Sequence, residues 1–216
     1  MEGASDYVLA EDGDIWATSS VYELEVADFI ESTIWRFDKL GNELERWVIP
    51  ERAWHISSDG SGGIVLGLGR PRCGYLRVRP EAPAEHNALP TNSPVTCGSG
   101  ESKDLIFGHA DGYLGSLDES VLETGSLITS IASSPNGWIS GHEDGSISMK
   151  AVSEQLPGSI DSVGIVDSNG WASSFDGVKV LIMIIGEESN NISHDSRIRK
   201  MDSSSNRIVL GDDSGR

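Results

Sequence analysis

The stretch "WISGHEDGSISMKAV", residues 138–152, contains the pattern that decides the fold. An apolar run ends at a Gly-His pair, an Asp-Gly pair follows, and a second run then alternates polar and apolar residues. Asp-Gly between two such runs is a strong hairpin signal, because glycine accepts the positive φ that a tight turn requires. The sequence therefore predicts two short antiparallel strands joined at Asp144-Gly145.

The same pattern recurs along the chain at an almost constant spacing. Three copies align by eye: "DLIFGHADGYLGSL" (104–117), "GWISGHEDGSISMK" (137–150) and "GWASSFDGVKVLIM" (170–183). Their turn glycines Gly112, Gly145 and Gly177 are 33 and 32 residues apart. Weaker copies are "GGIVLGLGRPRCGYLRV" (62–78) and "NRIVLGDDSGR" (206–216). Four short strands in a repeated unit of this length are typical of a β-propeller blade.

We therefore expect an all-β fold in which residues 1–216 form a single β-propeller domain of four-stranded antiparallel blades. The blades are expected at 5–50, 51–93, 94–126, 127–159 and 160–196, with a partial sixth at 197–216. The sequence stops after two strands of the sixth blade, so we expect an incomplete ring in a truncated chain or one completed by another chain. Between the second and third strands of the first blade, the acidic segment 21–31 is expected to form a loop.

The stretches "LIFGHADGYLGSLD" and "WISGHEDGSISMKAV" resemble the second and third strands of WD-repeat blades. Two WD hallmarks are absent: no Trp-Asp closes the third strand, where "SLDES" and "KAVSE" stand, and no Gly-His precedes the first strand. The first blade, with "GDIWATSS" and "IWRFDKLGNELERW", is more similar to NHL, virginiamycin-lyase and quinoprotein-like propellers. The resemblance implies a WD-like propeller, from families that are mostly interaction scaffolds with an enzyme minority.

The charge of the chain restricts the class of partner. Its 34 acidic and 16 basic residues give a formal net charge of -18, which repels phosphate backbones and anionic lipid. We therefore expect neither a nucleic acid nor a membrane as partner. The acidic start has no apolar leader, so a cytoplasmic protein is expected. Cys73 and Cys97 have no zinc-site or redox spacing and are expected to be free thiols.

A candidate binding rim follows from the predicted fold, because the turns between second and third strands should lie on one face. The polar residues of these turns are His109, Asp111, His142, Glu143, Asp144, Asp176, Asp212 and Asp213. Each Asp before a turn glycine is expected to accept a hydrogen bond from an amide two residues on. Beyond this, the rim is either a solvated acidic face or a ring of carboxylates that holds a cation or steers a basic peptide. Arg70 and Arg72 would give the matching turn of the second blade a positive charge.

No catalytic pattern is present: GxSxG, P-loop and HExxH sequences are all missing, and no cofactor is expected. His109 and His142 lie on different blades, too far apart to share a metal ion, and are expected to close the ends of their strands by hydrogen bonding. Trp138 and Trp171 begin equivalent strands and are expected to pack between blades. The leading hypothesis is a non-catalytic scaffold for a protein or peptide. The alternative is a lyase- or lactonase-type propeller enzyme with a divalent ion at a central channel.

Overall fold

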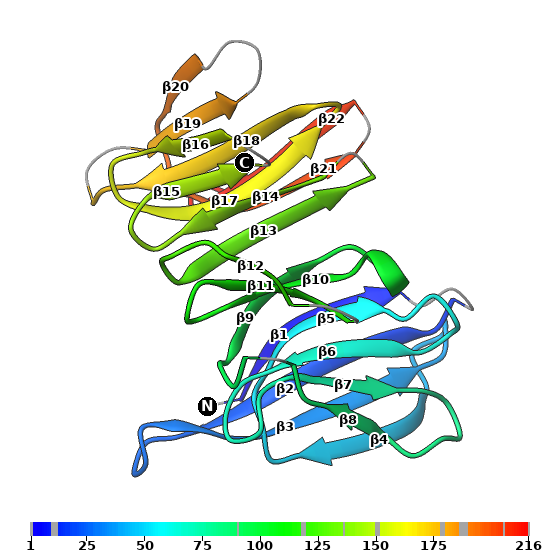
Figure 1. The fold of residues 1–216 in the computed structure, drawn as a ribbon. Helices are drawn as coiled ribbons and strands as arrows, with labels where there is room; N and C mark the ends of the chain where they lie inside the picture. The colour runs from blue at the N-terminus through cyan, green and yellow to red at the C-terminus, as the bar shows by residue number, and fades with distance from the viewer. Residues whose placement is uncertain are drawn as a thin grey trace. The chain divides into compact units, whose positions relative to one another are not determined.

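The computed structural model describes residues 2–9, 13–89, 91–117, 120–135, 137–149, 152–177, 180–185, 190–204 and 206–215. These residues form five four-stranded sheets and one two-stranded sheet, and all strand pairs given with a register are antiparallel (Figure 1). Each four-stranded sheet joins four consecutive strands in sequence order, as a propeller blade does. The expected fold class, four-stranded antiparallel blades with a partial sixth, is confirmed. No described helix is long and apolar enough to cross a membrane.

The chain divides into two compact units. Unit 1 comprises Met1–Phe107 and Gly115–Ser120, and unit 2 comprises Gly108–Leu114 and Val121–Arg216. Sheet 1 contains β1 (Glu2–Leu9), β2 (Ile15–Glu23), β3 (Asp28–Phe37) and β4 (Glu43–Ile49). Sheet 2 contains β5 (Ala53–Ser58), β6 (Ile64–Leu68), β7 (Tyr75–Val78) and β8 (Glu85–Asn87). Both belong to unit 1.

Sheet 3 contributes strands to both units. It contains β9 (Val95–Ser99), β10 (Ile106–His109), β11 (Tyr113–Ser116) and β12 (Ser120–Glu123), with a short 3-10 helix at Ser102–Asp104. Unit 2 then has sheet 4, with β13 (Ile128–Ser134), β14 (Gly137–His142), β15 (Ser146–Met149) and β16 (Val152–Gln155). Sheet 5 follows, with β17 (Ser159–Val166), β18 (Asn169–Phe175), β19 (Val180–Ile185) and β20 (Asn190–His194).

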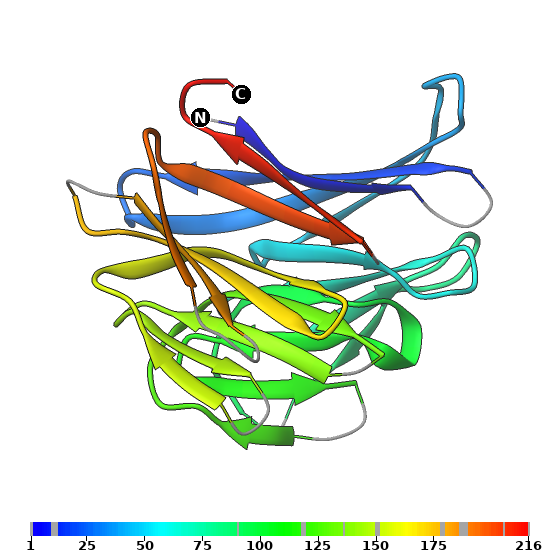
Figure 2. The ribbon, with the colours of Figure 1, turned by 90° about the horizontal axis from the view of Figure 1, so that it is seen from above.

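Sheet 6 is the hairpin of β21 (Ile198–Ser204) and β22 (Arg207–Asp212), drawn in orange and red in Figure 2. Its register shifts between Ile198 and Lys200, near the start of its first strand. The first strand pairs of sheets 4 and 5 shift at the same place, between Ile128 and Ser130 and between Ile160 and Ser162. Sheet 6 therefore has the geometry of the first two strands of a blade.

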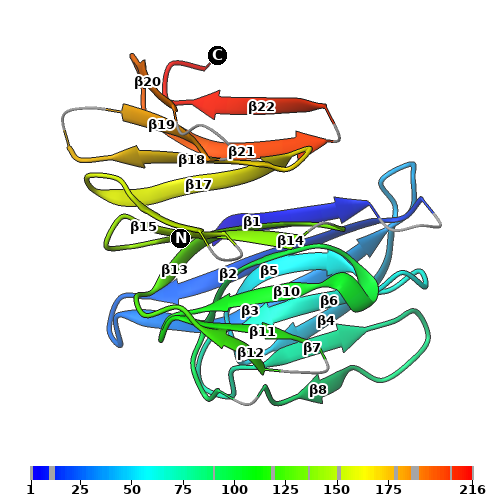
Figure 3. The same cartoon turned by 45° about the horizontal axis from the view of Figure 1, so that its top comes forward.

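Apolar side chains hold neighbouring sheets together inside each unit. In unit 1, one buried cluster joins sheets 1 and 2 through residues that include Trp16, Ile34, Ile56, Leu66 and Leu76. A second joins sheets 2 and 3 through residues that include Val65, Tyr75, Val95, Leu105 and Phe107. In unit 2, the corresponding clusters include Ile139, Ile147, Val163 and Met183 for sheets 4 and 5, and Val180, Ile182 and Ile198 for sheets 5 and 6. Figure 3 shows sheets 5 and 6 side by side. The alternating apolar residues of the repeat thus face neighbouring sheets.

The expectation of a loop over residues 21–31 is wrong. β2 continues to Glu23 and β3 begins at Asp28, so only residues 24–27 form a turn. Tyr22 pairs with Phe29 across the hairpin, and their rings meet edge to face with centroids 5.1 Å apart. Such cross-strand aromatic pairs stabilise a hairpin even where its other side chains are charged. Glu23, Asp28 and Glu31 therefore belong to an extension of the two strands, and of the acidic residues only Glu25 lies in the turn.

Candidate functional site

The Asp-Gly turns of unit 2 have a common local structure. The amide and the hydroxyl of Ser146 donate to Oδ1 of Asp144 at 2.9 and 2.6 Å. The amide of Tyr113 donates to Asp111 at 3.4 Å, and the amide of Ser214 donates to Asp212 at 2.9 Å. The following glycines have positive φ: 84° at Gly112, 86° at Gly145, 93° at Gly177 and 79° at Gly215. Asp111, Asp144 and Asp212 therefore stabilise the turns of sheets 3, 4 and 6, and the glycines allow all four turns.

Three connectors, residues 124–127, 156–158 and 195–197, lead from one sheet to the next and contact these turns through backbone atoms. In the first connector, the amide of Thr124 donates to the carbonyl of Gly112 at 2.8 Å. At the other end of this connector, the amide of Glu143 donates to the carbonyl of Leu127 at 2.9 Å. One connector thus ties the turn of sheet 3 to the turn of sheet 4.

Each of the other two connectors forms one such backbone hydrogen bond with a turn. The amide of Leu156 donates to the carbonyl of Gly145 at 3.0 Å. Gly158 lies so close to the turn of sheet 5 that an added Cβ would be 2.6 Å from the carbonyl oxygen of Phe175. In the third connector, the carbonyl of Arg197 accepts from the amide of Asp213 at 3.0 Å. Backbone hydrogen bonds therefore hold the turns of sheets 3, 4 and 6 against their connectors, and the second connector approaches the turn of sheet 5 closely at Gly158. We call these four turns of unit 2 the linked turns.

The acidic side chains of these turns differ in exposure from the histidines. Exposed carboxylates are those of Asp111, Glu143, Asp144, Asp176 and Asp213, whereas Asp212 is partly buried. His109 and His142 are fully buried. Both histidines were included in the predicted rim, but buried imidazoles add nothing to its surface.

His142 has a clear structural role. Its Nδ1 lies 2.9 Å from the carbonyl oxygen of Ser126, and its Nε2 lies 3.0 Å from Oγ of Ser140. A carbonyl only accepts, so Nδ1 must carry the proton, and in the neutral ring Nε2 accepts from the hydroxyl of Ser140. His142 therefore ties the end of β14 to the first connector.

The charge of the linked turns is partly neutralised at sheet 6. Arg199 binds both carboxylate oxygens of Asp213 at 2.7 and 3.1 Å, and this lowers the pKa of Asp213. His194 lies 2.9 Å from Asp212, and Arg197 pairs with Asp161 at 2.6 Å. At sheet 4, the hydroxyl and then the amide of Ser146 lower the pKa of Asp144. The excess of acidic charge thus lies at the turns of sheets 3, 4 and 5.

The basic turn of sheet 2 lies in unit 1 and is largely structural. Arg72 forms a two-pronged ion pair with Glu51, with Nη2 2.8 Å from Oε2, and the side chain of Glu51 is fully buried. Arg72 therefore fastens the turn to the residues that precede β5, whereas Arg70 is exposed. Sequence reasoning missed Glu51, which looks like an ordinary surface acid directly after Pro50.

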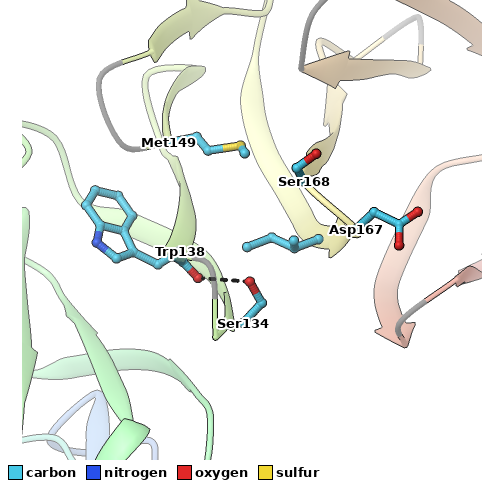
Figure 4. A pocket seen from close by; sticks show the side chains of 7 residues that line it. Ser134, Trp138, Met149, Asp167 and Ser168 are labelled. Carbon is cyan, nitrogen blue, oxygen red and sulfur yellow. Dashed lines mark hydrogen bonds between the residues drawn. The ribbon is translucent and has the colours of Figure 1, made fainter.

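Unit 2 has a shallow recess of about 10 Å³ between sheets 4 and 5. In Figure 4, Trp138 and Met149 approach from sheet 4, and Asp167 and Ser168 approach from the β17–β18 turn. Small-molecule sites usually have volumes of about 300–1,000 Å³, so this recess is small for a substrate.

Trp171 does not line the recess and packs against the buried cluster of sheets 5 and 6. Cys73 and Cys97 are free thiols, and no group of three or more His, Cys, Asp or Glu in the described ranges could hold a metal ion.

Comparison with known proteins shows similarity of fold only. No protein-family model matches the chain, and no curated protein matches it. Among solved structures, a mercury-soaked crystal of BBS1N in complex with ARL6DN matches this chain with a TM-score of 0.65 and 12% identity. The match covers 99% of this chain and 74% of that one. A lead-soaked crystal of the same complex matches with a TM-score of 0.61 and 10% identity, over 97% and 84%. The fold is propeller-like.

A computationally designed protein, Ika8, has a similar fold as well. It matches with a TM-score of 0.55 and 12% identity, over 99% of this chain and 94% of the designed one. Similarity to a designed chain at this identity reflects the shared architecture of repeated four-stranded sheets. Function must therefore be argued from the residues of this protein.

Proposed function

We propose that the protein is a non-catalytic, WD-repeat-like scaffold that binds a basic protein or peptide through the linked turns of unit 2. The observation that carries this proposal is the set of backbone hydrogen bonds that holds the turns of sheets 3, 4 and 6 against their connectors on one side. These bonds hold the exposed carboxylates of Asp111, Glu143 and Asp144 on a preformed surface, and Asp176 adds an exposed carboxylate at the turn of sheet 5. Fixed charges of one sign steer an oppositely charged partner and lose little entropy when it binds.

The solved complex of BBS1N with ARL6DN supports an interaction role in general, since it shows a chain of similar fold bound to another protein.

The two strands of sheet 6 suggest a second kind of partner. β22 corresponds to β18 of sheet 5, which pairs with β19 along its other edge. We therefore also propose that a further segment of a longer polypeptide pairs with β22 as a third strand.

The enzymatic alternative, a lyase- or lactonase-type propeller, requires several inward-pointing metal ligands. In the part of the chain that the structure describes, no specific observation favours it. The scaffold is therefore the function that the described side chains support best.

A charge-matched pair of variants tests the scaffold proposal. In the acidic-turn variant, the substitutions are Asp111→Asn, Glu143→Gln, Asp144→Asn and Asp176→Asn, which keep an oxygen acceptor at each turn. The control removes four exposed carboxylates of unit 1 by Glu43→Gln, Glu81→Gln, Glu85→Gln and Glu101→Gln. Both variants change the net charge equally, so any difference between them reports position.

The probe is a fluorescein-labelled peptide of alternating Arg and Gly, and its binding is measured by anisotropy at low and high salt. Exposed charge pairs contribute about 0.2–1 kcal/mol each, so the loss of four should weaken binding by the acidic-turn variant about fourfold or more. The control should bind within about twofold of wild type, with circular dichroism confirming that all three proteins are folded. An equal loss in both variants would show that only net charge matters and would refute the proposed site.

A further inference from the structure

The hairpin of β2 and β3 extends beyond the rest of sheet 1. β1 pairs with β2 as far as Val21, and β4 pairs with β3 as far as Ser32. Residues 22–31 therefore form a two-stranded extension, and in the described residues neither β1 nor β4 pairs with it. Figure 1 shows this extension as the blue hairpin at the lower left. We name residues 22–31 the arm.

Aromatic and cationic side chains fasten the base of the arm to sheet 2. The guanidinium carbon of Arg52 lies 3.6 Å from the ring centroid of Phe29 and 3.3 Å from that of Trp54. Burial lowers the pKa of Arg52 to about 10, so it remains a cation at neutral pH. A cation between two aromatic faces contributes about 0.5–2 kcal/mol per contact. The arm is therefore fixed at its base.

The arm exposes large apolar side chains at its turn, residues 24–27, and on β3. Leu24 is 86% exposed, Val26 is 60% exposed and Ile30 is 41% exposed. Leu24 is the most exposed large apolar residue in the described part of the chain. Burying three such side chains in a partner would release about 1.5–3 kcal/mol each, before the costs of association. An anchored hairpin with this composition is typical of a protein interface.

The charge of the arm restricts what can cover these side chains. The arm carries Glu23, Glu25, Asp28 and Glu31, and no Lys or Arg occurs between Val21 and Trp35. A second copy would bring two sets of carboxylates together, and an anionic lipid surface would repel them. A partner must therefore present apolar residues together with Lys or Arg.

We propose that the arm is a docking element for a basic, amphipathic segment of a partner protein, which covers Leu24, Val26 and Ile30 and pairs its cations with the arm's carboxylates. The bare edge of β3 at 28–31 offers backbone groups to which an extended segment can add as a strand. This site lies entirely in unit 1. It does not depend on the linked turns of unit 2.

The test uses the full chain and three labelled peptides: alternating Leu and Lys, alternating Ser and Lys, and alternating Leu and Glu. The wild-type protein should bind the Leu-Lys peptide at least about tenfold more tightly than either of the others, because both apolar and charged contacts are required. The variant Leu24→Ser, Val26→Ser should lose about tenfold in affinity for this peptide. Leu40→Ser is the matched control, since Leu40 is 80% exposed outside the arm, and it should bind as wild type.

Several outcomes would overturn the proposal. The first is equal binding of the Leu-Lys and Leu-Glu peptides, and the second is an unchanged affinity of the double serine variant for the Leu-Lys peptide. The third is self-association of the wild-type protein in sedimentation experiments that the double serine variant abolishes. The last result would assign the arm to a second copy of the chain. Loss of binding in the acidic-turn variant with the arm intact would place the Leu-Lys site in unit 2 and would also overturn the proposal. The Arg-Gly peptide tests the linked turns separately, so the two proposals can fail independently.

Discussion

Alanine at Gly145 should destabilise unit 2 more than alanine at Gly177, although both glycines follow an Asp at the same position of the repeat. Both have a positive φ, 86° and 93°, which an L-residue adopts at a cost of about 1–2 kcal/mol. Their surroundings differ. A Cβ on Gly145 would lie 2.6 Å from the carbonyl oxygen of Gly158 and closer still to that of Leu156, whereas no described atom lies within 4 Å of a Cβ on Gly177.

The difference between the two variants measures how closely the second connector packs on its turn. Forcing a methyl group into a packed site costs about 1–3 kcal/mol in addition to the φ term. The expected loss in free energy of unfolding is therefore about 1–2 kcal/mol for Gly177→Ala and about 2–5 kcal/mol for Gly145→Ala.

The measurement is urea denaturation followed by tryptophan fluorescence, at matched protein concentration and pH. Both glycines belong to unit 2, so both variants should shift the same transition. Gly177→Ala serves as the control for the free-energy cost of placing alanine at a positive φ. Equal losses in the two variants would refute the close packing of the connector against the turn of sheet 4.

Three further predictions concern buried polar groups. Arg72→Ala should cost about 3 kcal/mol in urea denaturation, because it leaves the buried Glu51 carboxylate unpaired, and a loss below about 1 kcal/mol would contradict this. Burial raises the pKa of Asp59, but hydrogen bonds from Arg79 and neighbouring groups outweigh it and leave the pKa below 3.8. The carboxylate therefore stabilises the folded protein above the pKa that Asp59 has in the unfolded chain, and this stabilisation is lost as pH falls through its pKa in the folded protein. In acid titrations, the free energies of unfolding of wild type and Asp59→Asn should differ at neutral pH and converge below pH 3.8. His142→Phe should lower the melting temperature, since a buried carbonyl loses its donor at a cost of about 1–3 kcal/mol, and should leave Arg-Gly peptide binding unchanged.

The regular part of the fold was predictable because it depends on short-range patterns. Asp-Gly pairs at spacings of 33 and 32 residues located the hairpins of sheets 3, 4 and 5, and alternating apolar residues located the strands beside them. These features act within a few residues and recur, so one sequence contains several independent copies of the same signal.

The parts that sequence reasoning missed depend on contacts between distant residues. The arm was expected to be a loop because its carboxylates obscure the cross-strand pair of Tyr22 and Phe29 and the packing of Arg52 on Phe29. The ion pair of Arg72 with Glu51 joins residues 21 positions apart, and nothing in either local sequence indicates the other. Burial of His142 likewise depends on Ser126, which lies in a connector 16 residues earlier.

The hydrogen bonds of the three connectors also bear on how such a chain can diverge. They use carbonyl and amide groups of the backbone, so the turns keep their positions whatever side chain stands at 143. Descendants of this sequence could therefore exchange amino acids at the tips of the turns, and with them the preferred partner, at little risk to folding. The binding specificity of such a repeat protein can therefore change one turn residue at a time.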